Sequence, residues 1–260
     1  MGVDWERLRR VLGQNTPPAD LIYTERCKST NDLVRQHFSE PGSLNIILAC
    51  TDYQEHGRGV HGHSWSSPGS SDALFTLGFR PDALGYTVDP RLPLCAGVLI
   101  QRTIRIAFGI VLRCKWPNDL VTNDGRKAGG ILVLNNAGYV AIGVGLNVNS
   151  LPVDYPEDLR GKVITLREIF GHEIDRTLLY LVIIPELLKH IAGTPGYTCD
   201  DLINLWSDCA KGLGYPMKMV VDSKTEVVTP ARINRLTGEL IVIRQDGDEL
   251  ALSSADYIET

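Results

Sequence analysis

The stretch QEHGRGVHGHSW at residues 54–65 combines glycines, an arginine and a tryptophan in a pattern that could bind an anion. Gly57, Gly59 and Gly62 have the G-x-G-x-x-G spacing of dinucleotide-binding folds. That fingerprint needs a helix directly after the glycines, because the free N–H groups of the helix hold the pyrophosphate. Here HSWSSPGSS follows, which cannot begin a helix. We therefore reject the dinucleotide-binding interpretation.

A glycine-rich loop remains, and such a loop can hold a phosphate in another way. Its backbone N–H groups can surround the anion while the Arg58 guanidinium pairs with it and the loop closes over the ligand. Trp65 adds an aromatic surface at the end of the loop. An ordinary exposed surface loop is the alternative, and this segment alone does not decide between the two.

Three further segments place glycines or polar side chains at expected strand ends. They are KWPNDL at 115–120, KAGGIL at 127–132 and GVGLNVN at 143–149. Glycines on adjacent strands would make a flat floor that a planar ligand can approach closely. Each segment alone is also explained by turn chemistry, since Pro-Asn-Asp and Gly-x-Gly are common in turns.

The elements that must position these segments follow from the apolar periodicity. Helices are expected at 4–13, 30–39, 91–107, 175–192 and 198–211. Strands are expected at 45–51, 73–79, 110–115, 129–135 and 139–147. Because strands and helices do not alternate strictly, we predict an α+β fold with a mixed, mainly antiparallel sheet and packed helices.

The character of the chain changes after Gly212, where short strands are joined by tight turns. Four strands are expected there: MKMVV, EVVTPARI, ELIVIR and ELALS. This pattern predicts a small SH3-like β-barrel at the C-terminus. We expect two domains, a catalytic domain at 1–210 and the small β-barrel domain at 211–260.

Composition narrows the class of function. The 260 residues are 43% hydrophobic with a formal net charge of −5 and no basic arm, so nucleic acid is not an expected partner. No stretch approaches the roughly 20 apolar residues of a membrane span, and we expect a cytoplasmic protein. The six cysteines are scattered and never form C-x-x-C, and the histidines beside the glycine-rich loop lack a third ligand. No metal site is therefore predicted.

Taken together and in this order, the motifs resemble those of biotin protein ligases, the holocarboxylase synthetases of the biotin/lipoate ligase family. The matching pieces are Ser29-Thr30-Asn31, the loop from Ala49 through Pro68, KWPNDL, KAGGIL and GVGLNVN. The resemblance extends over essentially the whole chain, including the small C-terminal β domain. It implies a minimal ligase without an N-terminal DNA-binding domain, since few residues precede Ser29.

The resemblance implies a two-step reaction. The carboxylate of biotin attacks the α-phosphorus of ATP to give biotinyl-5′-adenylate and pyrophosphate, and a lysine of an acceptor then attacks the mixed anhydride. Biotin and ATP are the implied substrates, and Mg²⁺ is expected with ATP. The implied acceptors are the biotin carboxyl carrier domains of biotin-dependent carboxylases.

The resemblance also assigns roles to individual residues. The implied catalytic residues are Lys127 and Arg58. The implied biotin contacts are Ser29, Thr30, Asn31, Gln54, Gly57, Arg58, Lys127, Gly130 and Gly143. The implied nucleotide contacts are Arg58, Trp65, Lys115, Asn118 and Asn147. Asp119 could approach Mg²⁺, although an anchor for Lys115 or for its own turn is the favoured role.

The sequence departs from the family pattern in the glycine-rich loop. Val60 and His63 stand where family members typically carry arginines, which predicts weaker retention of the adenylate. We expect the loop to be mobile without ligand and to close when ligand binds. Two alternatives stay open: a lipoate or octanoate protein ligase, although no R-R-x-x-G-G-G stretch is found, and a non-catalytic relative that binds biotin.

Overall fold

The structure is a computed structural model that describes residues 2–14, 18–194, 196–221, 224–253 and 256–257. The helices are α1 (Trp5–Gly13), α2 (Thr30–Ser39), α3 (Pro81–Leu84), α4 (Leu92–Phe108), α5 (Leu166–Phe170), α6 (Arg176–Ile191) and α7 (Cys199–Cys209), with 3₁₀ turns η1 (Val60–Gly62) and η2 (Pro152–Asp154). The strands are β1 (Asp20–Cys27), β2 (Ile46–Gln54), β3 (Gly57–Arg58), β4 (Ser64–Trp65), β5 (Ala73–Phe79), β6 (Arg113–Lys115), β7 (Asp119–Val121), β8 (Lys127–Asn136), β9 (Tyr139–Leu146), β10 (Met217–Val221), β11 (Lys224–Ile233), β12 (Leu240–Ile243), β13 (Glu249–Leu252) and β14 (Asp256–Tyr257).

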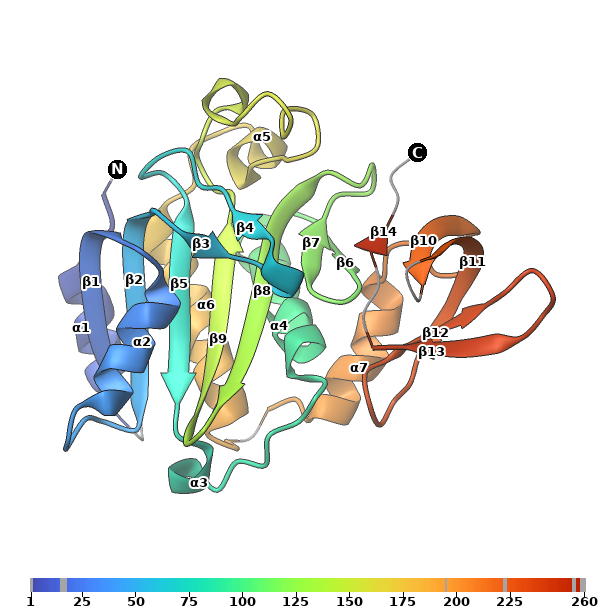
Figure 1. Ribbon diagram of the computed structural model, residues 1–260. Coiled ribbons are helices and arrows are strands. Elements are labelled where there is room, and N and C mark those ends of the chain that lie inside the picture. Colours follow the sequence, from blue (N-terminus) through green and yellow to red (C-terminus); the bar gives the residue numbers. More distant parts are fainter. Residues whose placement is uncertain (1, 15–17, 195, 222–223, 254–255, 258–260) are drawn as a thin grey trace.

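The main sheet has the strand order β1-β2-β5-β9-β8-β7-β6 (Figure 1). β1 pairs parallel with β2, and all the other neighbours pair antiparallel. The predicted α+β class with a mixed, mainly antiparallel sheet is thus confirmed. The sequence analysis does not predict β1, because its second half is polar and lies at the sheet edge, where burial is incomplete.

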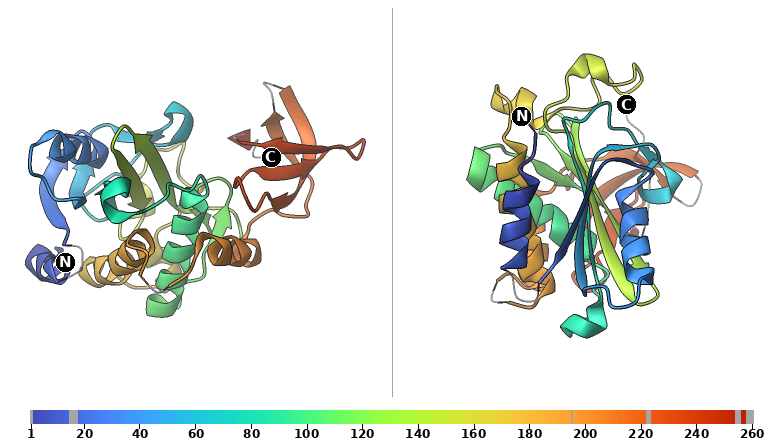
Figure 2. Two further views of the ribbon diagram at one scale, coloured as in Figure 1. Left: turned by 90° about the horizontal axis from the view of Figure 1, so that it is seen from below. Right: turned by 90° about the vertical axis from the view of Figure 1, so that its left-hand side faces the viewer.

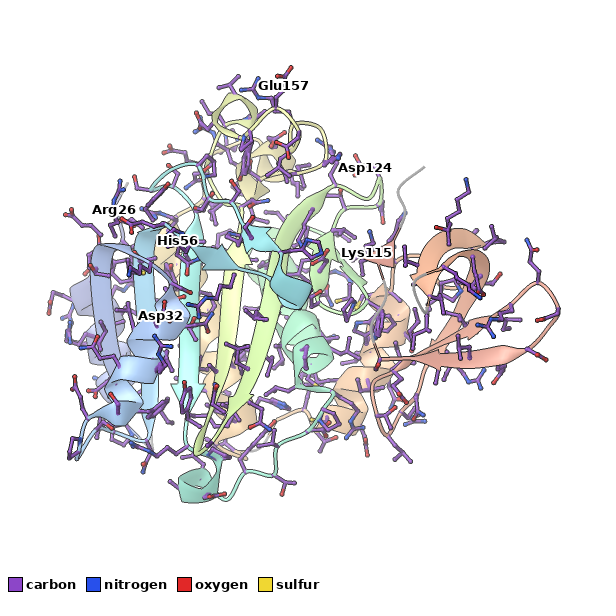
Figure 3. All side chains as sticks on the ribbon, viewed as in Figure 1. Arg26, Asp32, His56, Lys115, Asp124 and Glu157 are labelled. Carbon is purple, nitrogen blue, oxygen red and sulfur yellow. The ribbon has the colours of Figure 1, made fainter. Side chains whose placement is uncertain are left out.

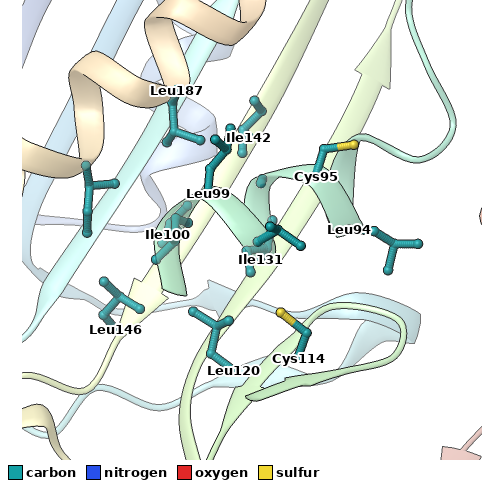
Figure 4. Packing of buried hydrophobic residues seen from close by; sticks show 14 of the residues in the cluster. Leu94, Cys95, Leu99, Ile100, Cys114, Leu120, Ile131, Ile142, Leu146 and Leu187 are labelled. Carbon is teal, nitrogen blue, oxygen red and sulfur yellow. The ribbon is translucent and has the colours of Figure 1, made fainter. Parts of the chain in front are cut away.

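Helices cover both faces of this sheet (Figure 2). On one face α2 packs against β2, β5 and β9, with Val34, Ile47, Ala49 and Ala141 at the contact. The larger core lies on the other face, under α1, α4 and α6. Figure 4 shows it around α4, where Leu99 and Ile100 lie close to side chains of α6 and of the sheet. The α2 face is therefore less completely covered, which leaves room for a site.

A second sheet follows α7, with the strand order β13-β12-β11-β10-β14 and antiparallel pairing throughout. The small β unit predicted at the C-terminus is confirmed by this sheet, while the division at residue 210 stays a prediction. Among the hydrogen bonds that join it to the rest of the chain, Trp116 Nε1 donates to Gly238 O at 3.0 Å and Arg91 Nη1 donates to Arg235 O at 2.6 Å. In the described part of the chain, no helix has the length and apolar character that crossing a membrane requires.

Candidate active site

A cavity of about 280 Å³ lies on the α2 face of the main sheet, beneath the β3–β4 hairpin. It gathers residues that are far apart in the sequence. The predicted site residues that line it are Thr30, Asn31, Gln54, Arg58, Trp65, Lys115, Asn118, Lys127, Gly130 and Gly143. Val60 and His63 of the glycine-rich loop line it as well. The structure thus brings most of the predicted residues to one place.

The floor of the cavity is the glycine surface expected from the sequence. Gly130 of β8 is paired with Gly145 of β9. The Trp65 indole lies directly on this floor, because a Cβ placed on Gly145 would come within 2.8 Å of three indole atoms. The buried Trp65 Nε1 has no hydrogen-bond partner among the described residues. A ligand acceptor would satisfy that N–H group.

A cluster of polar side chains lies at one end of the cavity, where Thr30, Asn31 and Gln54 line it. Gln54 Oε1 accepts hydrogen bonds from the Thr30 backbone N–H at 2.9 Å and from Thr30 Oγ1 at 3.2 Å. The hydroxyls of Thr30 and Thr76 lie 2.7 Å apart, and Asn31 Oδ1 is 3.4 Å from Thr76 Oγ1. Thr76 was not predicted, although its strand alternation could have placed it on this face. The cluster can offer both donors and acceptors to a polar ring.

Lys127 supplies a cation to the cavity. Its Nζ lies 2.6 Å from Asp119 Oδ1 and 5.5 Å from the centroid of the Trp65 ring. Asp119 therefore forms an ion pair with Lys127. The sequence analysis does not predict this pair. The Lys127 backbone is fixed on both sides, since its N–H donates to Lys162 O at 2.8 Å and its carbonyl accepts from Ile164 N at 2.9 Å.

A β-bulge turns Lys127 toward the cavity. In the pairing of β7 with β8, Leu120 lies opposite Gly129 and Val121 lies opposite Lys127, so Ala128 is an extra residue. Ala128 is buried in the large core. Strict alternation would place Lys127 on the core face with Gly129, but the extra residue moves it to the face of Gly130.

Arg58 stands at the rim of the cavity with its side chain 48% exposed. Its Nη2 donates to both carboxylate oxygens of Asp32 at 3.0 Å. Asp32 belongs to the first turn of α2 and also pairs with Arg35 at 3.1 Å. Asp32 and Lys115 stand on either side of the hairpin in the view of Figure 3. The helix therefore holds the loop arginine next to the cavity.

Three predicted residues do not line the cavity. Ser29 is buried at the N-cap of α2, and its Oγ has no hydrogen-bond partner among the described residues. Gly57 is needed for close strand approach, because a Cβ there would lie 2.6 Å from Trp65 O. Asn147 is buried, and its Nδ2 donates to Lys127 O at 2.9 Å and to Ile164 O at 3.4 Å. The Asn147 side chain thus contacts the backbone of Lys127, and its predicted nucleotide contact stays a prediction.

The strand end that carries Asn147 has an anchor that the sequence analysis missed. Asp72 accepts hydrogen bonds from Val148 N at 2.8 Å and from Ser150 Oγ at 2.9 Å. Burial raises the pKa of Asp72, although these hydrogen bonds and the charge of Arg176 oppose the change. The sequence analysis missed Asp72 because it lies 76 residues before Val148 in the chain.

Comparison with known proteins agrees with the geometry. Residues 23–149, which contain every residue that lines the cavity, match the model of the biotin/lipoate A/B protein ligase family. This region of the chain is therefore similar to that family. It is 32% identical over 215 residues to the bifunctional ligase/repressor BirA of Bacillus subtilis, an alignment that covers 80% of this chain and 63% of that relative. The chain thus spans less than two thirds of that relative's length.

Other relatives are similar over more of their own length. The biotin–acetyl-CoA-carboxylase ligase of Paracoccus denitrificans is 28% identical over 184 residues, covering 68% of this chain and 76% of that protein. The fold is similar to that of biotin protein ligase from Aquifex aeolicus, solved in complex with biotin and ATP. That structure has a TM-score of 0.78 at 20% identity, covering 93% of this chain and 99% of the other.

Proposed function

We propose that this protein is an ATP-dependent biotin–protein ligase that forms biotinyl-5′-adenylate and transfers biotin to a lysine of an acceptor domain. The observation that carries the proposal is the position of Lys127, which places a cation in the cavity that the glycine floor, Trp65 and the loop arginine also line. The names of the relatives support this assignment, as does the complex of the Aquifex protein with biotin and ATP.

The polar end of the cavity suits the ureido ring of biotin. That ring presents N–H donors and a carbonyl acceptor, and Thr30, Asn31 and Gln54 offer complementary groups. A lipoyl chain ends in a disulfide ring that makes only weak hydrogen bonds. Polar groups of the cavity that face the ligand would then lose water without gaining a ligand partner, which costs about 1–3 kcal/mol for each unsatisfied group. The cluster therefore favours biotin over lipoate.

In the first step the biotin carboxylate oxygen attacks the α-phosphorus, and the bond from that phosphorus to the pyrophosphate oxygen breaks. Two anions must approach each other, so cations at the reacting groups lower the barrier. Lys127 is the first of these, and Arg58 is the second if it exchanges Asp32 for the ligand. The Trp65 face is available to stack on adenine.

Mg²⁺ is expected to enter with ATP. Among the described residues that line the cavity, Asp119 is the one carboxylate, and it is paired with Lys127. Mg²⁺ in nucleotide-binding enzymes is held by one or two carboxylates together with the phosphates. We therefore expect the triphosphate to supply most of its ligands, with Asp119 as the available protein group.

In the second step the amine of the acceptor lysine attacks the carbonyl of the anhydride, an amide forms and AMP leaves. We propose biotin carboxyl carrier domains of carboxylases as acceptors. A neutral amine is required for this attack, and Asp119 is placed to accept a proton if Lys127 moves toward the phosphate.

One assay separates the three functions. Purified protein is incubated with ATP and Mg²⁺, with either biotin or lipoate, and with a biotin carrier domain or a lipoyl domain. We expect biotin transfer alone, detected as a mass increase of the carrier domain. Transfer of lipoate instead would reveal a lipoate ligase. Binding of biotin without pyrophosphate release or transfer would identify a non-catalytic relative.

A further inference from the structure

A group of thiol and imidazole side chains lies outside the candidate active site, where three helices meet. Cys95 belongs to α4, His190 to the last turn of α6, and Cys199 is the first residue of α7. One ligand atom from each residue lies within 4.8 Å of the other two. Cys95 is fully buried and the other two are half-buried. The proposed ligase reaction uses none of them.

The spacing of these atoms is close to that of a tetrahedral metal site. Cys199 Sγ lies 3.7 Å from His190 Nε2. With Zn–S bonds of about 2.3 Å and Zn–N bonds of about 2.0–2.1 Å, a tetrahedron has edges of about 3.5–3.8 Å. The sulfur-to-nitrogen distance already fits this range, and small rotations of the side chains would bring the third atom within it.

The tautomer of His190 is suitable for metal binding. Its Nδ1 lies 3.3 Å from the backbone carbonyl oxygen of Tyr197. A carbonyl oxygen can only accept a hydrogen bond, so Nδ1 carries the proton and Nε2 keeps its lone pair. That lone pair is on the nitrogen nearest to Cys199. A carbonyl that orients the second ring nitrogen is the usual outer partner of a metal-bound histidine.

Tyr86 packs beside His190 and carries a buried hydroxyl group. Its ring packs edge-on against His190 with 6.3 Å between the ring centroids. Its buried Oη has no hydrogen-bond partner among the described residues. A water molecule that completes the coordination of a metal would supply that partner, and it would explain why this hydroxyl is buried without one.

We propose that Cys95, His190 and Cys199 bind one Zn²⁺ ion, with water as the fourth ligand. Two thiolates and an imidazole are the donor set that Zn²⁺ prefers. The ion would join α4, α6 and α7, and it would hold the end of α6 next to the start of α7. The sequence analysis predicts no metal site because these residues have no metal-binding spacing along the chain, and only the helix packing brings them together.

The test uses the full chain without a polyhistidine tag, purified under reducing conditions. We expect about one zinc per chain by elemental analysis. After removal of the zinc, we expect Co²⁺ to give a thiolate-to-cobalt charge-transfer band and the d–d bands of a tetrahedral site. Cys199→Ser and His190→Gln should lose both signals, whereas Cys27→Ser, which changes a half-buried cysteine of β1, should keep them.

A variant of Tyr86 tests whether its hydroxyl group hydrogen-bonds to the water at the fourth coordination position of the metal. Tyr86→Phe should keep the cobalt spectrum and weaken zinc affinity about tenfold in competition with a chromophoric chelator. Absence of bound zinc together with absence of the cobalt charge-transfer band in the reduced wild type would overturn the proposal. A Cys95–Cys199 disulfide that forms readily in place of metal binding would overturn it too, as would an unchanged cobalt spectrum in Cys199→Ser. None of these readouts depends on ligase activity.

Discussion

Lys127 holds its ammonium group between a carboxylate and an aromatic ring. Asp119 Oδ1 lies 2.6 Å from Nζ, and the Trp65 ring centroid lies 5.5 Å away. Asp119 keeps the ammonium group in the cavity, and an incoming anion must compete with this one carboxylate. Because the Lys127 side chain is 36% exposed, the pair is accessible to solvent and can exchange partners.

We expect Lys127→Ala to reduce adenylate formation at least about a hundredfold, the usual cost of losing one group that stabilises transition-state charge. The fold should persist, because the side chain lies in the cavity and not in the core. Pyrophosphate exchange measures the reaction, and circular dichroism checks the fold. Lys162→Ala is the matched control, since Lys162 is exposed and its backbone carbonyl accepts the hydrogen bond from Lys127 N–H, which the substitution keeps. Near-normal exchange in a folded Lys127→Ala protein would contradict the role.

Gly145 determines how closely the Trp65 indole can approach the floor of the cavity. A methyl group there would displace the Trp65 indole, and overpacking of this kind costs about 1–3 kcal/mol. Gly145→Ala should therefore lower the melting temperature and raise KM for ATP. Gly69→Ala is the control, because its Cβ would meet open space. Equal behaviour of the two variants would show that Trp65 does not need the glycine floor.

The β3–β4 hairpin is the element that joins these residues. The Gly59 N–H donates to His63 O at 2.7 Å, so the loop has a hydrogen-bonded form. Arg58 ties it to α2 through Asp32. Val60 and His63 line the cavity at the tip of the hairpin. Its mobility without ligand stays a prediction, and the free energy that closes it must come from contacts to the ligand.

Replacing both Val60 and His63 by arginine should slow the release of preformed biotinyl-adenylate about tenfold, which corresponds to about 1.4 kcal/mol. The rate of adenylate formation should change little, since Lys127 is untouched. Filter binding or stopped-flow fluorescence measures the release. The control Val153→Arg/Leu236→Arg adds two charges at exposed positions. An equal or faster release from the hairpin variant would show that the loop retains its ligand in another way.

At the scale of the whole molecule, the KWPNDL segment joins the cavity to the C-terminal sheet. Trp116 and Asn118 both line the cavity. Trp116 is also buried, and its Nε1 donates to Gly238 O in the turn before β12. Gly238 has a φ angle of +76°, and a Cβ added to it would lie 3.2 Å from Arg91 Cγ. Both facts favour glycine at this position. The C-terminal sheet thus contacts the wall of the candidate site.

Trp116→Phe removes this hydrogen bond and keeps most of the apolar contact. We expect a loss of about 1–3 kcal/mol, because the Gly238 carbonyl is left without its partner. Denaturant unfolding measures the loss, and limited proteolysis tests whether residues 211–260 detach as a unit. Trp5→Phe serves as the control, since Trp5 stacks on Tyr23 far from this contact. Unchanged stability and protease resistance in Trp116→Phe would show that the contact does not hold the sheet.

Ligand binding should stabilise the whole molecule selectively. At a concentration of 100 times Kd, a ligand contributes about 2.7 kcal/mol, which corresponds to about 5–10 °C for a chain of this size. With ATP and Mg²⁺ present, biotin should raise the melting temperature by this amount and lipoate should not. Differential scanning fluorimetry measures both. A shift with lipoate alone would place the protein in the lipoate branch of the family.

The apolar periodicity of the sequence was sufficient to predict most of the longer helices and strands. The predicted helices correspond to α1, α2, α4, α6 and α7 within one or two residues at most ends. Local patterns determine such elements because each buries one apolar face. The motifs also predicted that glycines of neighbouring strands would form a floor, with Gly130 and Gly143 as its members, and the strand pairing places Gly145 opposite Gly130. The polar edge strand β1 and the short β7 carried no periodic signal and were missed.

The tertiary structure decided which way the chemical groups face and which distant groups meet. One extra residue in β8, Ala128, changes the alternation and turns Lys127 from the core to the cavity, and no local pattern shows such a bulge. The strand pairing also brings the Asn147 side chain to the Lys127 carbonyl, a hydrogen bond that the sequence analysis does not predict. Cys95 and Cys199 are 104 residues apart in the chain, and their proximity depends on the packing of α4 against α7. Contacts of this kind arise from long-range packing, so the sequence carries them only through the complete fold.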